Sequence, residues 1–255
     1  MICAKCKKNF CEWVETSKEN FCKSCWEKIR PRCIVCREPL HGTYFVTHWG
    51  NVCNECHDPK LQCFSCDIQL AENQILRLPD FRPICSGCYS QAVFDAENGF
   101  IAAVGTALEK FLIVIKKPVH YRVVDLLKLQ HMIAERGNSS ITELGVCSTN
   151  FLGDRVSHHN IFFLFGMPSP QFMGVLAHEL FHAWINENCR HERLSREETE
   201  GACDLIAFKI HQVLGHDDFW VKKAESSERH PVYGYGLRKW KNMPISFVLS
   251  YLKSK

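Results

Sequence analysis

No stretch of this 255-residue chain approaches the roughly 20 consecutive apolar residues of a membrane-spanning helix. The nearest, residues 161–167, has the length of a strand and is expected in a core. The first residues also lack the apolar segment of a secretory signal peptide. From these absences we expect a soluble, cytoplasmic protein with no membrane partner.

A strong charge of either sign is missing as well. The chain carries 31 Lys and Arg against 28 Asp and Glu, a net charge of +3, and its basic residues are dispersed. Composition therefore gives no electrostatic argument for a groove that binds nucleic acid, and we expect no nucleic-acid partner.

Cysteine, in contrast, is abundant and unevenly placed. Thirteen of the 16 cysteines precede Glu97, and twelve form six C-x2-C pairs. Such pairs can be disulfides, but disulfides need an oxidising compartment, which a chain without a secretory signal is not expected to reach. Reduced thiols at this spacing indicate metal ligation, so the N-terminal region is predicted to depend on zinc for its order.

The six pairs group into three zinc-ribbon modules, because 15, 16 or 18 residues separate the first pair of each module from the second. Four thiolates leave no open position on a tetrahedral ion, so these three zinc sites are predicted to be structural. The predicted ligands are Cys3, Cys6, Cys22 and Cys25; Cys33, Cys36, Cys53 and Cys56; and Cys63, Cys66, Cys85 and Cys88. His48, His57 or Asp58 are alternatives to a neighbouring cysteine, and Cys11 has no obvious partner.

Beyond residue 92 the pattern changes to that of helices and strands. Residues 121–137 carry apolar side chains at helical spacing and end on a glycine suited to a helix C-terminus, which predicts an amphipathic helix. Residues 112–119 and 161–167 are short runs of β-branched or aromatic residues with a proline near one end, which predicts two strands.

Residues 170–188 predict a largely apolar helix that contains the sequence HELFH from His178 to His182. Two histidines four positions apart share one helical face, about 5–6 Å apart at Cβ, close enough to bind one metal ion. Glu179 lies beside them, where it reaches a metal-bound water rather than the metal. A chance HExxH on a buried helix is the alternative, since the chain has 13 histidines.

A second helix is predicted from Ser195, whose S-x-x-E pattern is that of a capping box, to about residue 214. A catalytic zinc needs three protein ligands and an open position, and two histidines with one glutamate are a known set. Glu200 supplies the third ligand in this interpretation, and Asp204, one turn later, is placed to orient a zinc-binding histidine. A solvated helix face is the alternative, but the small residues at 201–203 favour close helix packing.

These residues predict zinc-dependent cleavage of an amide bond, in which Glu179 takes a proton from a zinc-bound water. The developing oxyanion needs a further donor, and the glycine-containing segment 230–236 offers two candidates. Tyr233 is the first and His230 the second, while a tyrosine packed in a turn explains the same segment equally well.

These motifs resemble those of the DA-one family, the LIM-domain-containing, ubiquitin-activated peptidases of plant organ-size control. The resemblance runs from about Cys33 onward and rests on three segments in order, FLFGMP at 163–168 with LAHELFHAW at 176–184, EGAC at 200–203, and PVYGYG at 231–236. The module from Cys63 to Cys88 and the AVFD that follows it resemble the family's LIM-like module and its junction with the peptidase domain.

The resemblance implies an α+β fold in which zinc-ribbon or LIM-like modules precede a gluzincin-like metallopeptidase domain. We expect a zinc-ribbon or half-LIM module at 1–30, a LIM-like double zinc module at 31–92 and the peptidase domain at 93–255. The resemblance also implies limited cleavage of protein substrates, with ubiquitin and ubiquitin-ligase-type proteins as candidate partners. The ubiquitin-interacting helices of plant members have no counterpart in these 255 residues, which predicts a short form without them.

Three functions remain as hypotheses. The leading one is an active zinc endopeptidase with one catalytic and three structural Zn²⁺ ions, because the set His178, Glu179, His182 and Glu200 is complete. The second is a catalytically idle LIM-type scaffold for protein interactions. The third, nucleic-acid binding, rests on the type of zinc module alone.

Overall fold

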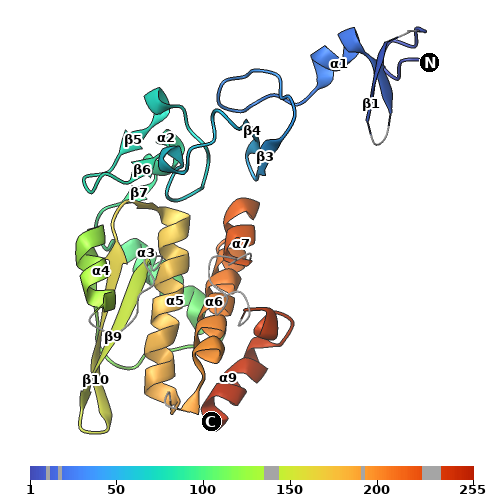
Figure 1. Cartoon of the computed structure of the whole chain (residues 1–255). Coiled ribbons are helices and arrows are strands. Elements are labelled where there is room, and N and C mark those ends of the chain that lie inside the picture. The colour runs from blue at the N-terminus through green and yellow to red at the C-terminus, as the bar shows by residue number, and fades with distance from the viewer. Residues whose placement is uncertain (10–11, 17–18, 135–143, 191–192, 226–236) are drawn as a thin grey trace. The chain divides into compact units, whose positions relative to one another are not determined.

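The computed structural model describes residues 1–9, 12–16, 19–134, 144–190, 193–225 and 237–255. The chain divides into two compact units, Met1–Ser86 and Gly87–Lys255 (Figure 1). In the described ranges, every helix is too short or too polar to cross a bilayer.

Three small hairpins build the first unit. They pair β1 (Trp13–Glu15) with β2 (Asn20–Cys22), β3 (Tyr44–Thr47) with β4 (Gly50–Cys53), and β5 (Leu76–Arg77) with β6 (Pro83–Ile84), all antiparallel. The second strand of each hairpin delivers the chain to a C-x2-C pair. Only short helices are added, α1 (Lys23–Ile29) and two single 3-10 turns (Pro59–Leu61 and Glu72–Gln74), and α2 (Ser86–Tyr89) begins at the last residue of this unit.

The turn after the first C-x2-C pair has the same backbone conformation in all three modules. The residue that follows the second cysteine has a positive φ each time: 59° at Lys7, 66° at Arg37 and 60° at Asp67. Its N–H donates to the carbonyl of the first cysteine of the pair, at 3.0, 3.0 and 2.9 Å. A left-handed non-glycine residue is uncommon, so its recurrence at one place shows that the modules are three copies of one structural unit.

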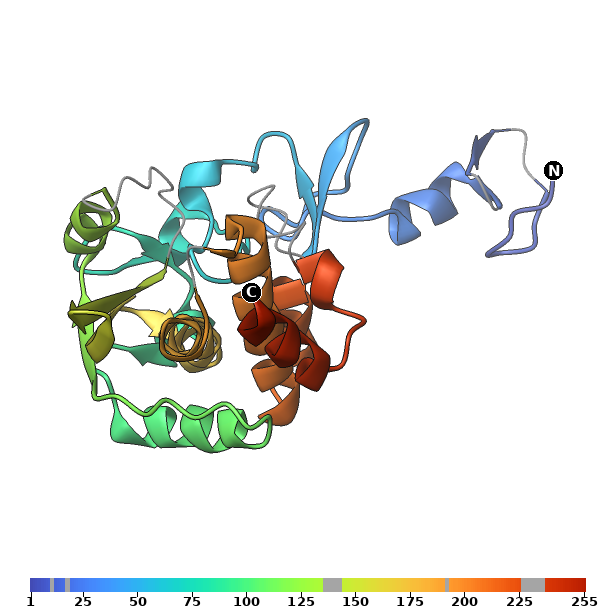
Figure 2. The ribbon, with the colours of Figure 1, turned by 90° about the horizontal axis from the view of Figure 1, so that it is seen from below.

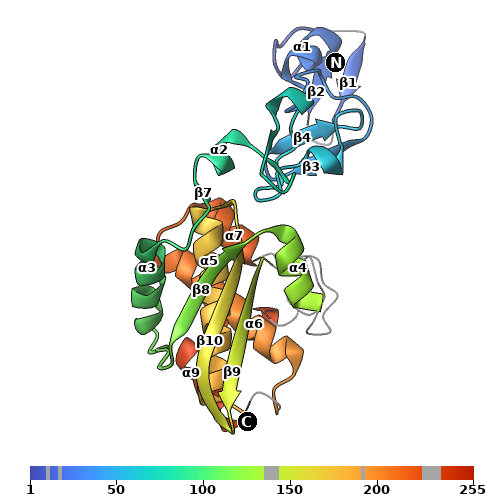
Figure 3. The ribbon, with the colours of Figure 1, turned by 90° about the vertical axis from the view of Figure 1, so that its left-hand side faces the viewer.

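A three-stranded sheet in the order β8-β10-β9 forms one layer of the second unit. The long central strand β10 (Arg155–Leu164) pairs parallel with β8 (Val119–Val124) and antiparallel with β9 (Gly145–Leu152). A two-residue ladder joins β7 (Ala92–Val93) to β11 (Met167–Pro168), directly before the next helix. Figure 3 shows the sheet in front of the helices that cover one of its faces.

The helical layer is centred on α5 (Ser169–Asn188) and α6 (Arg196–Val213), which pack along each other. Figure 2 shows α5 nearly end-on, with the sheet on one side and α9 (Ile245–Ser254) on the other. Gly174 permits the close approach of α5 to α6, because a Cβ there would overlap the ring of His211. The remaining described helices with full bounds are α3 (Asn98–Glu109), α4 (Leu126–Ala134) and α7 (Asp218–Glu225).

The start of α6 agrees with the capping box expected from the sequence. The hydroxyl of Ser195 accepts the N–H of Glu198, and the Glu198 carboxylate accepts the N–H of Ser195 in return. Glu198 also accepts hydrogen bonds from Lys239 (2.9 Å) and from Tyr251 of α9 (2.5 Å). The first turn of α6 is therefore joined to the C-terminal helix, which restrains the turn that carries Glu200.

Two predicted elements are wrong in part. Residues 112–118 form no strand, because Leu112 has a positive φ of 61° and these residues have no strand partner among the described residues. The strand in this region, β8, begins only at Val119. The predicted helix 121–137 starts only at Leu126, since residues 121–124 pair with β10, and Gly137 lies outside the described residues. Asp125 separates the two elements and accepts the N–H of Lys128 at 2.7 Å.

A row of buried polar groups connects the sheet to the C-terminal end of α5. Asn186 donates to the hydroxyl of Thr149 (2.7 Å), and this hydroxyl donates to Nδ1 of His159 (2.9 Å), because the carboxylate of Glu187 beyond the ring can only accept and so places the ring hydrogen on Nε2. The Nε2–H of His159 then donates to Glu187 (3.1 Å), and burial lowers the pKa of His159 despite this carboxylate. Two backbone N–H groups complete the environment of Glu187 at 2.8 Å each, those of Lys116 and Lys117.

Candidate metal centres

The structure brings together the four cysteines of each predicted module. The groups able to hold a metal ion are Cys3, Cys6, Cys22 and Cys25; Cys33, Cys36, Cys53 and Cys56; and Cys63, Cys66, Cys85 and Cys88. Sulfur pairs across these groups lie 3.9, 3.9 and 3.8 Å apart. Four sulfurs at about 2.3 Å from one zinc ion would lie about 3.8 Å from each other, so the spacing fits a tetrahedral site.

Backbone N–H groups surround the first sulfur of a module. The N–H groups of Val35 and Cys53 both lie 3.4 Å from Sγ of Cys33. Burial alone would raise the pKa of Cys33, but hydrogen bonds from Cys53, Cys36 and Val35 outweigh it and lower the pKa to about 6. A similar environment lowers the pKa of Cys3 to about 6. These sulfurs are therefore prepared for the thiolate form that zinc requires.

The alternative ligands in the second module are engaged elsewhere. His57 stacks on Phe45 with ring centroids 3.6 Å apart, and Asp58 accepts the N–H of Lys60 at 2.9 Å. His48 contacts the ring of Trp49 edge-on. The cysteines in the described ranges form no disulfide with one another, which argues against the disulfide alternative, and Cys11 lies outside those ranges.

Three atoms from α5 and α6 form a compact triangle in the second unit. Nε2 of His178 lies 3.1 Å from Nε2 of His182 and 3.2 Å from Oε2 of Glu200. Nε2 of His182 lies 3.4 Å from the same Oε2 of Glu200. Ligand atoms at about 2.0–2.1 Å from a tetrahedral zinc ion are about 3.3–3.4 Å apart. The three sequence-predicted ligands therefore have the spacing of three corners of a zinc site.

The hydrogen-bond partners of His178 strengthen this interpretation. Nδ1 of His178 lies 3.0 Å from Oδ1 of Asp204, and a carboxylate can only accept a hydrogen bond. Nδ1 of the neutral ring therefore carries the hydrogen, and Nε2 presents a lone pair to the triangle. Converging lone pairs repel one another unless a cation or a proton lies between them, which is the environment expected at a metal site.

The local electrostatics also favour a cation. Burial would lower the pKa of His178, but Asp204 and Glu200 outweigh it and hold the pKa well above its usual range. Burial would likewise raise the pKa of Glu200, but the nearby His182 and His178 hold it below its usual range. Carboxylates around two histidines thus attract positive charge to this point.

Cys203 is a member of this cluster that the sequence analysis treated only as a small packing residue. Its sulfur and the ligand nitrogens of His178 and His182 all lie within 4.8 Å of one another. Burial and the charges of Glu200 and Glu179 raise the pKa of Cys203 well above its usual range, which favours the neutral thiol. Oε2 of Glu200 completes the tighter triangle, at 3.2 and 3.4 Å from the two histidine nitrogens.

Glu179, the predicted proton acceptor, is 6% exposed and lies against the first residue of β9. A Cβ on Gly145 would come within 2.9 Å of Cγ and 3.0 Å of Oε1 of Glu179, and within 2.7 Å of Cγ1 of Val175. No side chain fits beside Glu179 without displacing it, so the glycine is required here by a close approach.

The Gly145→Ala substitution is therefore expected to retain zinc and the fold while lowering any peptidase activity on the order of 10²-fold, the effect of a roughly 1 Å misplacement. Cleavage rate, zinc per chain and the thermal transition would be measured on one preparation. Gly99→Ala is the matched control, because a Cβ there meets no atom within 4 Å. Equal cleavage rates for the Gly145→Ala and wild-type proteins would show that Glu179 does not require a glycine at position 145.

The predicted oxyanion donors Tyr233 and His230 lie outside the described residues, so their roles stay predictions.

Comparison with known proteins places these residues in a family context. Residues 131–226, which contain all of α5 and α6, match the family model described as DA1-like, Protein DA1. The chain is 25% identical over 237 residues to Protein DA1-related 7 of Arabidopsis thaliana, with 78% of this chain and 40% of that protein covered. It is 27% identical over 240 residues to Protein DA1-related 6 of the same organism, with 80% and 35% covered.

The chain thus spans less than half the length of the curated relatives it matches. The match to the family model includes the HExxH helix and the helix of Glu200, two of the segments on which the sequence resemblance rests. The chain is thus similar to the DA1-like family over residues 131–226 and to two DA1-related proteins over most of its length.

Proposed function

We propose that this protein is a zinc-dependent endopeptidase that makes limited cleavages in protein substrates. The observation that supports the proposal is the triangle of His178, His182 and Glu200, with sides of 3.1, 3.2 and 3.4 Å. The two histidines and the glutamate would hold one Zn²⁺ and leave a fourth position open. The three cysteine groups would hold structural Zn²⁺ ions.

When bound, Zn²⁺ supplies Lewis acidity that polarises a peptide carbonyl and makes water more acidic. Glu179 accepts a proton from the attacking water at its carboxylate and returns that proton to the leaving amine. Asp204 holds His178 in one tautomer and orientation. Gly145 leaves the Glu179 carboxylate the space it needs to make this transfer.

The free edge of β9 offers a place for the substrate. Among the described strands β9 pairs only with β10, so its other edge has no strand partner in these ranges, and its first residue lies against Glu179. A peptide segment added along this edge would be held extended by backbone hydrogen bonds. An extended backbone presents its carbonyl groups at regular intervals, which suits the cleavage of a flexible segment.

Glu179→Gln tests the proposal. The amide fills the same space but cannot accept a proton, so fold and zinc content should be retained while cleavage falls on the order of 10²–10⁴-fold. New protein N-termini would be counted by mass spectrometry in a cell extract incubated with each variant, and zinc by elemental analysis. The exposed Glu109→Gln serves as control. Undiminished cleavage by the Glu179→Gln protein would contradict the role of Glu179 and with it the proposed peptidase mechanism.

The same experiment decides the alternative of a catalytically idle interaction scaffold. That alternative is favoured by the exposed side chains of β3, where Tyr44, Phe45 and Val46 are 38, 41 and 78% exposed. Such apolar exposure on a hairpin suits a protein partner. If fully zinc-loaded wild type produces no more new N-termini than Glu179→Gln, the scaffold becomes the better account. Ubiquitin and ubiquitin-ligase-type proteins stay predicted partners under either reading.

A further inference from the structure

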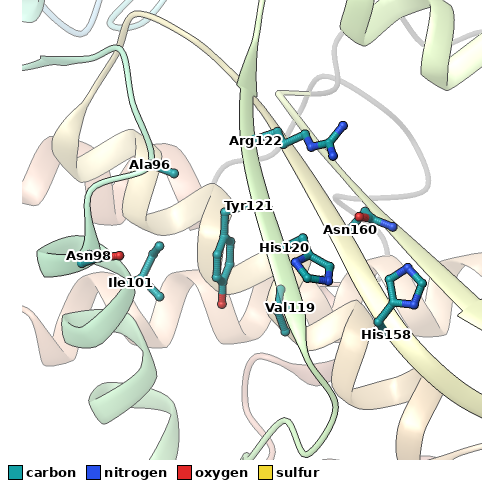
Figure 4. A pocket seen from close by; sticks show the side chains of 9 residues that line it. All are labelled: Ala96, Asn98, Ile101, Val119, His120, Tyr121, Arg122, His158 and Asn160. Atoms are coloured by element: carbon teal, nitrogen blue, oxygen red, sulfur yellow. The ribbon is translucent and has the colours of Figure 1, made fainter.

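A cavity of about 620 Å³ lies along the edge of the sheet, at β8. Its lining includes four consecutive residues of that strand, 119 to 122. Successive side chains of a strand point to opposite faces, so a cavity on one face would be lined by alternate residues only. A cavity lined by all four therefore follows the backbone edge of β8, as Figure 4 shows.

The backbone at this edge has no strand partner in the part of the chain that the structure describes. The N–H of His159 donates to the carbonyl of Pro118, and the N–H of Phe165 donates to that of Val124, at 2.9 Å each. Even-numbered residues of β8 therefore direct their backbone groups toward β10, and the alternation of a strand directs those of Val119 and Tyr121 outward. No described strand pairs with β8 on that side.

The two walls of the cavity differ in chemistry. One wall carries basic and amide side chains that can donate hydrogen bonds, His120 and Arg122 from β8 and His158 and Asn160 from β10 (Figure 4). The rings of His120 and His158 lie close together, with centroids 5.5 Å apart. On the opposite wall, Tyr121 lies on the same side of β8 as Ala96 and Ile101, with Asn98 as a polar neighbour (Figure 4).

Charge and shape together define the ligand. None of the nine lining residues is acidic, and Arg122 supplies a permanent positive charge and a fork of donors that matches a carboxylate. A strand added to β8 would place alternate side chains against the two walls. Acidic side chains would face Arg122 and the histidines, and apolar side chains would face Tyr121 and Ile101.

We propose that the edge groove of β8 binds an extended peptide segment in which acidic and apolar residues alternate, held as an added strand. The groove is separate from the candidate zinc triangle, because β8 and β9 are the two opposite edges of the sheet and only β9 touches Glu179. Peptide binding in this groove requires neither zinc at the triangle nor cleavage. A test of this proposal is therefore independent of the proposed peptidase activity.

The test is fluorescence anisotropy of a labelled seven-residue peptide of alternating glutamate and valine with the full zinc-loaded chain. Arg122→Glu is expected to weaken binding at least tenfold, because it places a like charge against the peptide carboxylates. Arg155→Glu is the matched control, an exposed arginine on β10 that does not line the groove, and should change affinity less than twofold. Equal weakening by both variants would show a nonspecific charge effect and overturn the proposal.

A second probe tests the added strand without changing the protein. N-methylation of alternate peptide residues removes the donors on one peptide edge, so one of the two methylated registers should lose at least tenfold in affinity. Glutamine in place of glutamate should weaken binding to a similar degree. Binding that is indifferent to both N-methylation registers, or equally strong for the glutamine peptide, would contradict the proposed mode.

Discussion

Replacing His178 and His182 together by alanine is expected to lower the zinc content from about four ions per chain to about three and to abolish cleavage. Both nitrogens belong to the ligand triangle, and a single remaining carboxylate, Glu200, cannot hold the ion at neutral pH. The fold should persist, because both histidines remain partly exposed and the helices pack through other side chains. Elemental analysis and far-UV circular dichroism would be made on the same sample.

Two single variants separate the possible third ligands. Glu200→Ala should also lose the fourth ion, whereas Cys203→Ser should keep it, because Oε2 of Glu200 is the atom 3.2 and 3.4 Å from the two histidine nitrogens. The reverse result would transfer the third ligand position to Cys203. A double histidine variant that still holds four ions would show that the triangle binds no metal.

The second large effect is expected at a structural site. Cys33→Ser/Cys36→Ser removes half of the ligands of the second module, and ligation contributes roughly 10–16 kcal/mol of apparent binding energy in small zinc peptides. The buried apolar cluster of this module is formed by Cys33, Leu40 and Val52, which is too small to hold the fold alone. One zinc should be lost, and amide signals of residues 31–57 should collapse toward unfolded positions in an NMR spectrum.

The expected loss is local. The thermal transition of Gly87–Lys255 should change little, because this unit has its own core around Phe163, Phe172 and Phe181. Cys189→Ser is the control, since this thiol belongs to no candidate metal group. Full zinc content in the Cys33→Ser/Cys36→Ser protein would mean that other atoms hold that ion.

The parts of the fold that the sequence predicted well depend on local signals. The start of α6 follows from the S-x-x-E capping box at Ser195, and the predicted helix at 170–188 differs from α5 by one residue. The geometry of His178, His182 and Glu200 follows from spacing within two helices and their packing. Such features are determined by residues three or four positions apart, which a single sequence displays directly.

The parts that could not be predicted depend on contacts distant in sequence. Residues 121–124 have apolar spacing compatible with a helix, and only pairing with β10, some 40 residues later, makes them a strand. The proximity of Gly145 to Glu179 and of Cys203 to the histidines likewise arises from packing of separate elements. The groove at β8 depends on which strand lies at the edge, and periodicity does not specify strand order.

The row of buried polar groups that ends at Glu187 determines the register of β10, which the hydrophobic pattern alone does not determine. A slip of β10 by two residues would keep every side chain on its own face, since the alternation of a strand repeats every two positions. Such a slip would bring Ile161 to the place of His159 and leave the buried carboxylate of Glu187 without its side-chain donor. Glu187 and Glu179 are eight residues apart on α5, about 12 Å along its axis. The hydrogen bond from His159 to Glu187, near the C-terminal end of α5, thus keeps Gly145, which pairs with Phe163 of β10, opposite Glu179 near the middle of the helix.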